Sequence, residues 1–310
     1  TTETLSFAAY AAEWIGAAVG GAESALSSMI AISDPSPCID GIPGNEKMLD
    51  RFLNPSDIGG RYSALSFVGL VPASLLGIDL DPLLAAGSVA AAELREPEPT
   101  ANRAVALGVV IGALAREGRD KLTLVVDAPI DGFGAWAEQL VAESTGKHGV
   151  GVVPVDGELL GAVAEYQDDR LFVRISLDGG RPPVAADGSS VGTRLNELAA
   201  AGHPVIELSL SDPIDLGGEF MRWEIATAIA GVVLGINPFD EPNVTESKNN
   251  TVAVLGELAA AGRLPELAPK AVDGALQIWV DDALPAAFSD DAVKLVAGQL
   301  QRLSPHGYVG

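Results

Sequence analysis

The chain has 310 residues, 48% of them hydrophobic, and a formal net charge of −23. This length and apolar content predict a globular protein with a substantial core and room for two modest domains, and they exclude a disordered chain. The acidic surface repels nucleic acid and anionic lipid, so neither is an expected partner. Cys38 is the sole cysteine, which excludes an intramolecular disulfide and favours a reducing cytoplasm.

The N-terminal third contains several apolar runs. Apolar residues recur at helical spacing over residues 5–15 and predict a helix, for which Thr2 and Thr4 would be capping residues. The longer apolar run over residues 64–76, opened by Ser63, predicts a buried helix. Two shorter runs predict strands, at residues 29–33 and 51–53.

Pro97 and Pro99 interrupt the pattern, and we place a boundary between two lobes there. The predicted parts are residues 1–98, which form the C-terminal part of a first lobe, residues 99–240, which form a second lobe, and residues 241–310, a helical segment with one strand that packs on both lobes.

The second predicted lobe alternates between helical and strand patterns. Helices are expected over residues 102–115, 133–142, 158–166, 194–201 and 216–234, and strands over 122–126, 150–155, 171–176 and 204–210. Further on, helices are expected at 246–262 and 291–303 and a strand at 276–280. Such alternation predicts an α/β fold with a doubly wound parallel sheet in three layers, and ligands of such sheets bind beyond the C-terminal ends of the strands.

The sequence Gly59-Gly60-Arg61 is a candidate anion site. The glycines allow close backbone approach and dihedral angles closed to other residues, and the guanidinium can hold a phosphate or an oxyanion through paired hydrogen bonds. A helix that starts beside it would add free N–H groups and a favourable dipole. On local grounds alone, a tight turn with a surface arginine explains the same residues equally well.

Glu143 is a candidate general base. It ends an amphipathic helix and precedes Ser-Thr-Gly-Lys, and a carboxylate held between apolar residues and a glycine turn is partly desolvated, which would raise its pKa toward neutrality. A solvated charge at a helix end is the commoner reading of such a residue. A nucleotide-binding P-loop is excluded because Val141 and His148 occupy positions that need Gly and Ser or Thr.

Other site classes find little support in the sequence. The histidines His148, His203 and His306 have no carboxylate or cysteine partners at ligand spacing, so no metal site is expected. The serine-hydrolase elbow and the dinucleotide-binding glycine fingerprint are both missing. No cofactor is therefore expected. A phosphorylated ligand would need local cations on so acidic a chain, and Arg61, Lys147 and Lys248 can supply them.

Residues 57–66, Asp-Ile-Gly-Gly-Arg-Tyr-Ser-Ala-Leu-Ser, resemble the signature of the glucose-6-phosphate (phosphoglucose) isomerase family. Three more stretches agree with that family in the same order, namely residues 1–4, 139–147 and 237–248. The amino-acid sequences of these three stretches are most similar to the isomerase half of fused transaldolase/phosphoglucose isomerase proteins. The resemblance implies two lobes of the sugar-isomerase (SIS) type, the first incomplete at its N-terminus, and a segment preceding residue 1.

The resemblance also implies roles for particular residues. Glu143 would move a proton between C2 and C1 of the sugar, and Arg61 would stabilise the enediolate. Lys248 would assist ring opening. Without the resemblance, the commoner interpretation of Lys248 is an exposed surface lysine. Substrate-binding residues would be Thr1 on the phosphate, together with Gly59, Gly60 and Gln139.

Three departures from the family pattern stand out. Residues 152–166 contain no histidine, although many members take a ring-opening histidine from the second subunit there, and His148 lies too early in the chain. Glu241 stands where many members have glutamine, and Phe67 stands where a small residue is usual. The second departure puts the charge near Lys248 in doubt.

We thus expect an isomerase that interconverts glucose 6-phosphate and fructose 6-phosphate in glycolysis and gluconeogenesis. The protein is expected to be cytoplasmic and homodimeric. A fused transaldolase half would link it to the pentose phosphate pathway. One alternative is a dual isomerase that also accepts mannose 6-phosphate. Another is a sugar-phosphate-binding SIS module without turnover. A coupled assay with both sugar phosphates would separate these possibilities.

Overall fold

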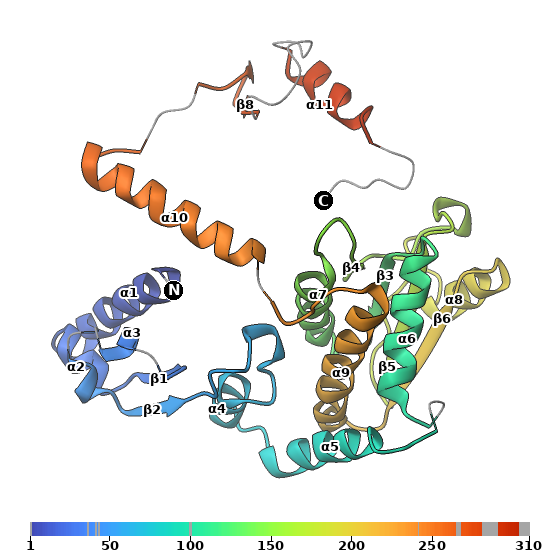
Figure 1. Cartoon of the computed structure of the whole chain (residues 1–310), viewed down its shortest axis with the longest axis horizontal. Coiled ribbons are helices and arrows are strands. Elements are labelled where there is room, and N and C mark those ends of the chain that lie inside the picture. The colour runs from blue at the N-terminus through green and yellow to red at the C-terminus, as the bar shows by residue number, and fades with distance from the viewer. Residues whose placement is uncertain are drawn as a thin grey trace. The chain divides into compact units, whose positions relative to one another are not determined.

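The computed structural model describes residues 2–35, 37–40, 42, 44–98, 101–240, 242–264, 268–280 and 291–303. The chain divides into two compact units, Thr1–Phe239 and Asp240–Gly310, and each is described by itself (Figure 1). No helix in these residue ranges combines the length and apolar character that a membrane crossing requires.

The first unit is built around a parallel four-stranded sheet in the order β4-β3-β5-β6. The strands are β3 (Lys121–Val126), β4 (Val153–Val155), β5 (Arg170–Leu177) and β6 (Val205–Leu210). Every residue of β3 is buried, as expected for a central parallel strand that is covered on both faces. The predicted strands are confirmed, although β4 is only three residues long.

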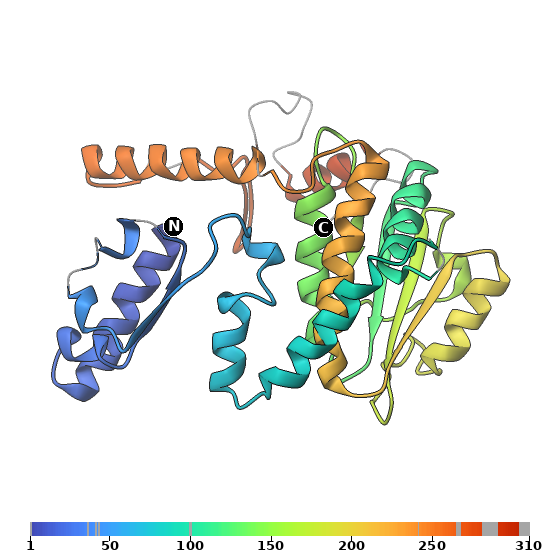
Figure 2. The ribbon, with the colours of Figure 1, turned by 60° about the horizontal axis from the view of Figure 1, so that its bottom comes forward.

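Helices cover both faces of this sheet. On one face lie α6 (Arg103–Arg116), α7 (Gly132–Thr145) and α9 (Leu216–Leu234), and their side chains share a core with Leu124 of β3. On the other face, α8 (Val191–Ala200) packs with Val125, the next residue of the same strand. Neighbouring strand residues thus point to opposite cores. The predicted α/β fold with three layers is confirmed (Figure 2).

Close contacts at glycine hold two helices against α9. A side-chain carbon at Gly108 of α6 would lie 2.3 Å from the carbonyl oxygen of Ala226, and one at Gly217 of α9 would lie 2.0 Å from that of Leu83. Leu83 belongs to α5 (Leu80–Glu93), a helix that the sequence pattern does not predict. Since only glycine allows such approaches, these positions bring the helix backbones into direct contact.

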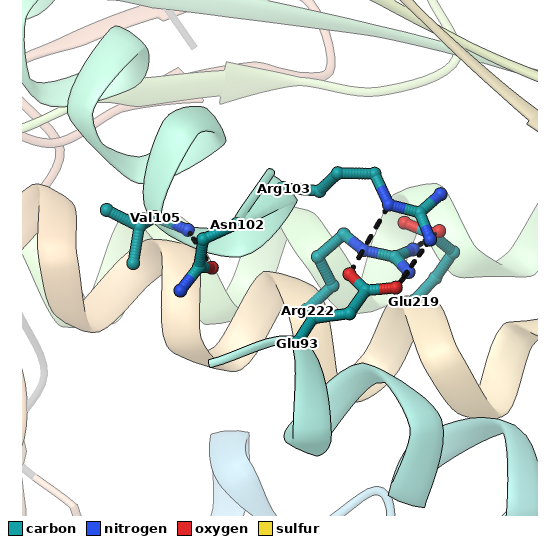
Figure 3. A network of polar contacts seen from close by, with 6 residues as sticks. All are labelled: Glu93, Asn102, Arg103, Val105, Glu219 and Arg222. Atoms are coloured by element: carbon teal, nitrogen blue, oxygen red, sulfur yellow. Dashed lines mark hydrogen bonds and ion pairs between the residues drawn. The ribbon is translucent and has the colours of Figure 1, made fainter. Parts of the chain in front are cut away.

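An ionic network also joins α5, α6 and α9 (Figure 3), in which Glu219 and Arg222 are buried and Arg103 is exposed. Glu93, at the end of α5, accepts from Arg103 at 2.5 Å and from Arg222 at 3.5 Å, and Arg222 also pairs with Glu219 within α9. Burial lowers the pKa of Arg222 from its ordinary value. The Asn102 side chain accepts from the Val105 N–H at 3.1 Å and caps α6. The network therefore connects elements on either side of residue 98.

The N-terminal part of the unit contains two paired strands. Parallel pairing joins β1 (Ile30–Ser33) and β2 (Asp50–Leu53), which confirms both predicted strands. The helix α1 (Thr2–Val19) is also confirmed, but it already includes Thr4, which therefore does not cap it. Short helices complete this part, namely α2 (Ala22–Leu26), α3 (Pro37–Asp40) and the 3₁₀ turn η1 (Asn45–Lys47).

Two expected helices differ in the structure. The apolar run gives α4 (Phe67–Leu75), which begins after the capping residue Ser66 instead of Ser63, and none of its residues is buried. Phe67 itself is 41% exposed, so the prediction of a buried helix is wrong. Over residues 158–166 only the 3₁₀ turn η3 (Val163–Glu165) forms, because the Tyr166 hydroxyl accepts from the Gly161 N–H and donates to Glu158 across the loop.

The second unit contains α10 (Pro242–Ala261), the antiparallel strands β7 (Ala271–Asp273) and β8 (Leu276–Ile278), and α11 (Ala292–Leu300). Both predicted helices and the predicted strand are confirmed. The sequence pattern does not predict the partner strand β7, because three residues are too short a run to show a period.

Gly108→Ala tests the close packing of α6 on α9. The added methyl meets a backbone carbonyl that cannot rotate away, so we expect the free energy of unfolding to fall by at least about 2 kcal/mol in urea titrations. Gly132→Ala is the matched control, since a side chain at Gly132 would meet nothing within 4 Å. Equal losses in the two variants would contradict this packing.

Candidate active site

Arg61 lies in the 3₁₀ turn η2 (Gly60–Tyr62) and is buried, with 3% of its surface exposed. Its Nε donates to Ser144 Oγ at 2.9 Å, and its Nη2 donates to the Pro238 carbonyl oxygen at 2.9 Å. The alternative of a surface arginine is therefore wrong. The guanidinium joins three segments that lie far apart in the sequence, namely η2, the end of α7 and the loop after α9.

Glu143 lies in the last turn of α7, next to this guanidinium. Its Oε2 is 3.7 Å from Arg61 Nη1, and Gln139 Nε2, one turn earlier, donates to its Oε1 at 3.3 Å. The Glu143 side chain is 40% exposed, so the expected desolvation of this carboxylate is wrong. Both oxygens are nevertheless oriented by neighbours, and an accessible carboxylate can reach a substrate.

Gly59 and Gly60 take no special backbone conformation. Gly59 has φ −67° and ψ 153°, which any residue can adopt, and Gly60 is not among the glycines with positive φ. The expectation of unusual dihedral angles is therefore wrong. A side-chain carbon at Gly60 would meet nothing within 4 Å, so this glycine leaves open space beside Arg61. No α-helix starts at this point either, because α4 begins at Phe67.

Tyr62 and Ser144 contribute contacts that the sequence analysis missed. The Tyr62 hydroxyl donates to Ser144 Oγ at 3.1 Å, so this oxygen accepts from both Tyr62 and Arg61. The Tyr62 ring lies 5.2 Å from the Phe239 ring and 5.5 Å from the Arg61 guanidinium carbon. Burial raises the pKa of Tyr62, so its hydroxyl remains a donor over the neutral range. Both residues belong to stretches that resemble the isomerase family, but their spacing alone gives no sign of this contact.

Lys147 fastens the loop after α9 to the end of α7. Its side chain is buried, and Nζ donates to the Asn237 carbonyl oxygen at 2.8 Å. The Asn237 side chain in turn accepts from the Phe239 N–H at 3.1 Å and shapes the loop. Two cations, Lys147 and Arg61, therefore hold successive carbonyl groups of this loop.

These residues gather at the amino edge of the sheet. α7 runs back from the carboxyl end of β3, and its last residue, Thr145, accepts from the Val152 N–H at 2.9 Å just before β4 begins. The general expectation of a site beyond the carboxyl ends of the strands therefore fails for Arg61 and Glu143. The reason is that Glu143 lies at the C-terminal end of α7, and this helix returns the chain to the edge of the sheet at which the strands begin.

A cavity of about 690 Å³ lies at the opposite, carboxyl edge. Apolar residues that follow β3 and β6 or belong to α4, α7 and α9 line most of it, among them Leu70, Phe133, Trp136 and Phe220. None of the sequence-predicted site residues lines this cavity. Its apolar wall does not match the chemistry of a phosphorylated sugar.

The remaining predicted residues are only partly placed. Lys248 lies in α10 of the second unit, so its convergence with Arg61 and Glu143 stays a prediction. Thr1 and Glu241 lie outside the described residues. His148 is exposed, with φ 55°. Within the described ranges, no group of three or more His, Cys, Asp or Glu side chains could hold a metal ion.

Known proteins resemble this chain over much of its length. A glucose-6-phosphate isomerase of Symbiobacterium thermophilum is 32% identical over 249 residues, which cover 70% of this chain and 55% of that protein. The first three curated relatives are each matched over 55–62% of their length, so the chain spans little more than half of them. No protein-family model matches the sequence.

Two solved structures share the fold. A hypothetical protein from Thermus thermophilus matches 82% of this chain and 69% of its own, with a TM-score of 0.70 and 24% identity. A glucose-6-phosphate isomerase from Chlamydia trachomatis matches 80% of this chain and 56% of its own, with a TM-score of 0.58 and 19% identity. At these identities the likeness concerns the fold, which agrees with the expected sugar-isomerase type.

Arg61→Lys tests whether the guanidinium fastens the three segments together. A lysine ammonium cannot reproduce the paired contacts with Ser144 and Pro238, so one acceptor is left without its donor. We expect the free energy of unfolding to fall by roughly 1–3 kcal/mol in urea titrations. Arg51→Lys is the control, because that side chain is 35% exposed and pairs at the surface with Asp40. An equal effect of both changes would contradict the role of Arg61.

Proposed function

This chain is a relative of the glucose-6-phosphate isomerases, and we propose that it catalyses the interconversion of glucose 6-phosphate and fructose 6-phosphate. The observation that carries the proposal is the pairing of Glu143 with Arg61, whose Oε2 and Nη1 atoms lie 3.7 Å apart. Aldose–ketose isomerisation needs one base and one cation at the reacting carbons. Neither a metal nor a redox cofactor is required by this chemistry.

Glu143 is the proposed base. It takes the proton from C2 of the open-chain aldose and returns it to C1, so the reaction passes through a cis-enediol. The partial exposure of its side chain leaves it accessible to a sugar, and the hydrogen bond from Gln139 fixes its rotamer. A positioned base of this kind contributes roughly 10²–10⁴-fold to the rate.

Arg61 is the proposed stabiliser of the enediolate. Negative charge develops on the sugar oxygens as the proton leaves carbon, and a cation that is already in place stabilises that charge without reorganising. The hydrogen bonds to Ser144 and Pro238 hold the guanidinium plane in position before substrate arrives. The open space at Gly60 would let the sugar approach this plane closely.

The remaining roles in the proposal come from the family resemblance. Thr1 would bind the phosphate, Gly59 and Gly60 would contact the substrate through their backbone, and Lys248 would assist ring opening. Since the net charge of −23 repels a sugar phosphate at long range, binding depends on such local donors and cations.

Glu143→Gln tests the proposed base. In a coupled assay with fructose 6-phosphate we expect kcat to fall roughly 10²–10⁴-fold with a smaller change in KM, because the amide keeps the shape of the side chain but cannot accept the proton. Glu138→Gln is the matched control, since Glu138 is exposed on the same helix.

Near wild-type turnover of a folded Glu143→Gln protein would overturn this assignment. A parallel assay with mannose 6-phosphate shows whether the second hexose is also a substrate. Binding of either sugar phosphate by the wild-type protein without turnover would indicate a binding module instead of an enzyme.

A further inference from the structure

Ser144 is a buried acceptor behind the Arg61 guanidinium. It lies in the last turn of α7 and has none of its surface exposed. Its Oγ accepts from Arg61 Nε at 2.9 Å and from the Tyr62 hydroxyl at 3.1 Å. A serine oxygen has two acceptor lone pairs, and both are therefore used within the protein. Ser144 can thus orient its neighbours, but it cannot also accept a hydrogen bond from a substrate.

The orientation of Arg61 depends on this acceptor. A guanidinium is rigid and planar, so the positions of two of its nitrogens determine the position of the third. Nε is held by Ser144, and Nη2 is held by the Pro238 carbonyl oxygen at 2.9 Å. The third nitrogen, Nη1, lies 3.7 Å from Glu143 Oε2. A shift of Ser144 Oγ would therefore displace Nη1 relative to the proposed base.

Tyr62 holds the Ser144 oxygen in place. A serine hydroxyl can rotate among staggered positions, and a hydrogen-bond partner selects one of them. The Tyr62 hydroxyl is such a partner, because it donates to the same oxygen that accepts from Arg61. Its ring lies 5.2 Å from the Phe239 ring and packs against the main core of the first unit. The ring is thus held by its neighbours and presents the hydroxyl in a fixed direction.

We propose that Tyr62 is a positioning residue of the isomerase site: its hydroxyl fixes Ser144 Oγ, and Ser144 in turn fixes the Arg61 guanidinium for the enediolate. This inference rests on the proposed function, in which Arg61 stabilises the charge that develops as the proton leaves carbon. Such stabilisation is effective only when the donor is already in place. Tyr62 acts on the sugar solely through Ser144 and Arg61.

The ring and the hydroxyl of Tyr62 contribute separately. The ring centre lies 5.5 Å from the guanidinium carbon of Arg61, a cation–π distance that a phenylalanine ring also provides. The contact with Phe239 is likewise a contact of the ring. The bond to Ser144, in contrast, needs the hydroxyl. If Tyr62 served packing alone, its replacement by phenylalanine would leave the site unchanged.

Tyr62→Phe is the first test. In the coupled assay with fructose 6-phosphate we expect kcat to fall roughly 3–10-fold with little change in KM, because the lost bond supports an interaction made mainly in the transition state. Tyr166→Phe is the matched control. Its hydroxyl accepts from the Gly161 N–H and donates to Glu158, and its ring packs with the core beneath α8, on the other face of the sheet. Its kcat should remain that of wild type.

Ligand binding separates this role from a loss of folded protein, which would also lower kcat. The probes are 5-phosphoarabinonohydroxamate, whose planar hydroxamate resembles the enediolate, and glucitol 6-phosphate, a saturated polyol without such a group. By calorimetry, Tyr62→Phe should weaken hydroxamate binding by about the factor by which kcat falls and leave the Kd of glucitol 6-phosphate unchanged. A smaller folded fraction changes the number of binding sites but neither Kd.

Ser144→Ala tests the order of the contacts. It removes the acceptor shared by Arg61 and Tyr62, and the bond to the guanidinium is charge-assisted, so we expect kcat to fall roughly 10–100-fold. Because Tyr62 acts through Ser144, adding Tyr62→Phe to Ser144→Ala should lower kcat by less than about twofold more. Independent effects would multiply instead, and that result would overturn the inference. Ser176→Ala, which removes a hydroxyl where β5 pairs with β6, is the control.

The Tyr62→Phe measurements decide the question even if Ser144→Ala does not fold. Wild-type kcat and hydroxamate affinity in a folded Tyr62→Phe protein would overturn the positioning role. So would an equal weakening of both ligands, because the hydroxyl would then support the site as a whole and not the enediolate. A folded wild-type protein that neither turns over fructose 6-phosphate nor binds the hydroxamate would overturn the proposed function itself, so the two failures are distinguishable.

Discussion

The burial of the Arg61 guanidinium is the constraint on which the candidate site depends. A charge removed from water is tolerated only where hydrogen bonds and an opposite charge compensate it. Ser144 and Pro238 supply the acceptors and Glu143 supplies the opposite charge. Because these partners come from two segments far from Arg61 in the sequence, satisfying one cation fixes the relative positions of η2, the end of α7 and the loop after α9. The geometry of the site is thus a consequence of the requirement to compensate a buried charge.

The scaffold that makes this possible is α9. Its N-terminal half is held against α5 by the contact of Gly217 with Leu83 and by the pair of Arg222 with Glu93, and glycines of α6 pack against its middle and its C-terminal half. Its C-terminal end delivers the loop of residues 237–239 to Arg61 and Lys147. The helix runs from the carboxyl edge of the sheet to its amino edge, so rigid packing along its length positions the carbonyl groups that follow its C-terminal end. A site built on packed helices is more rigid than one built on loops alone.

Much of this arrangement is visible in the sequence, and the reasons for the exceptions are physical. The strands of the sheet are continuous apolar runs between turns, and β3 and β5 could be predicted within a residue because parallel strands are buried on both faces. The pairing of Arg61 with Glu143 was expected from the family resemblance. Apolar content alone cannot show what covers a helix, so the exposure of α4 was not predictable. The contact of Tyr62 with Ser144 depends on tertiary packing, which spacing along the chain does not contain.

Glu143 and Glu224 show how the surroundings of a carboxyl group differ within one protein. The Glu143 side chain is 40% exposed, and its Oε2 lies 3.7 Å from Arg61 Nη1. The Glu224 Oε1 is buried without a hydrogen-bond partner among the described residues, and burial raises the pKa of Glu224 to about 8. A buried acid without partners cannot meet a sugar, whereas an exposed carboxylate beside a fixed guanidinium can, so the environment and not the residue type distinguishes the candidate base.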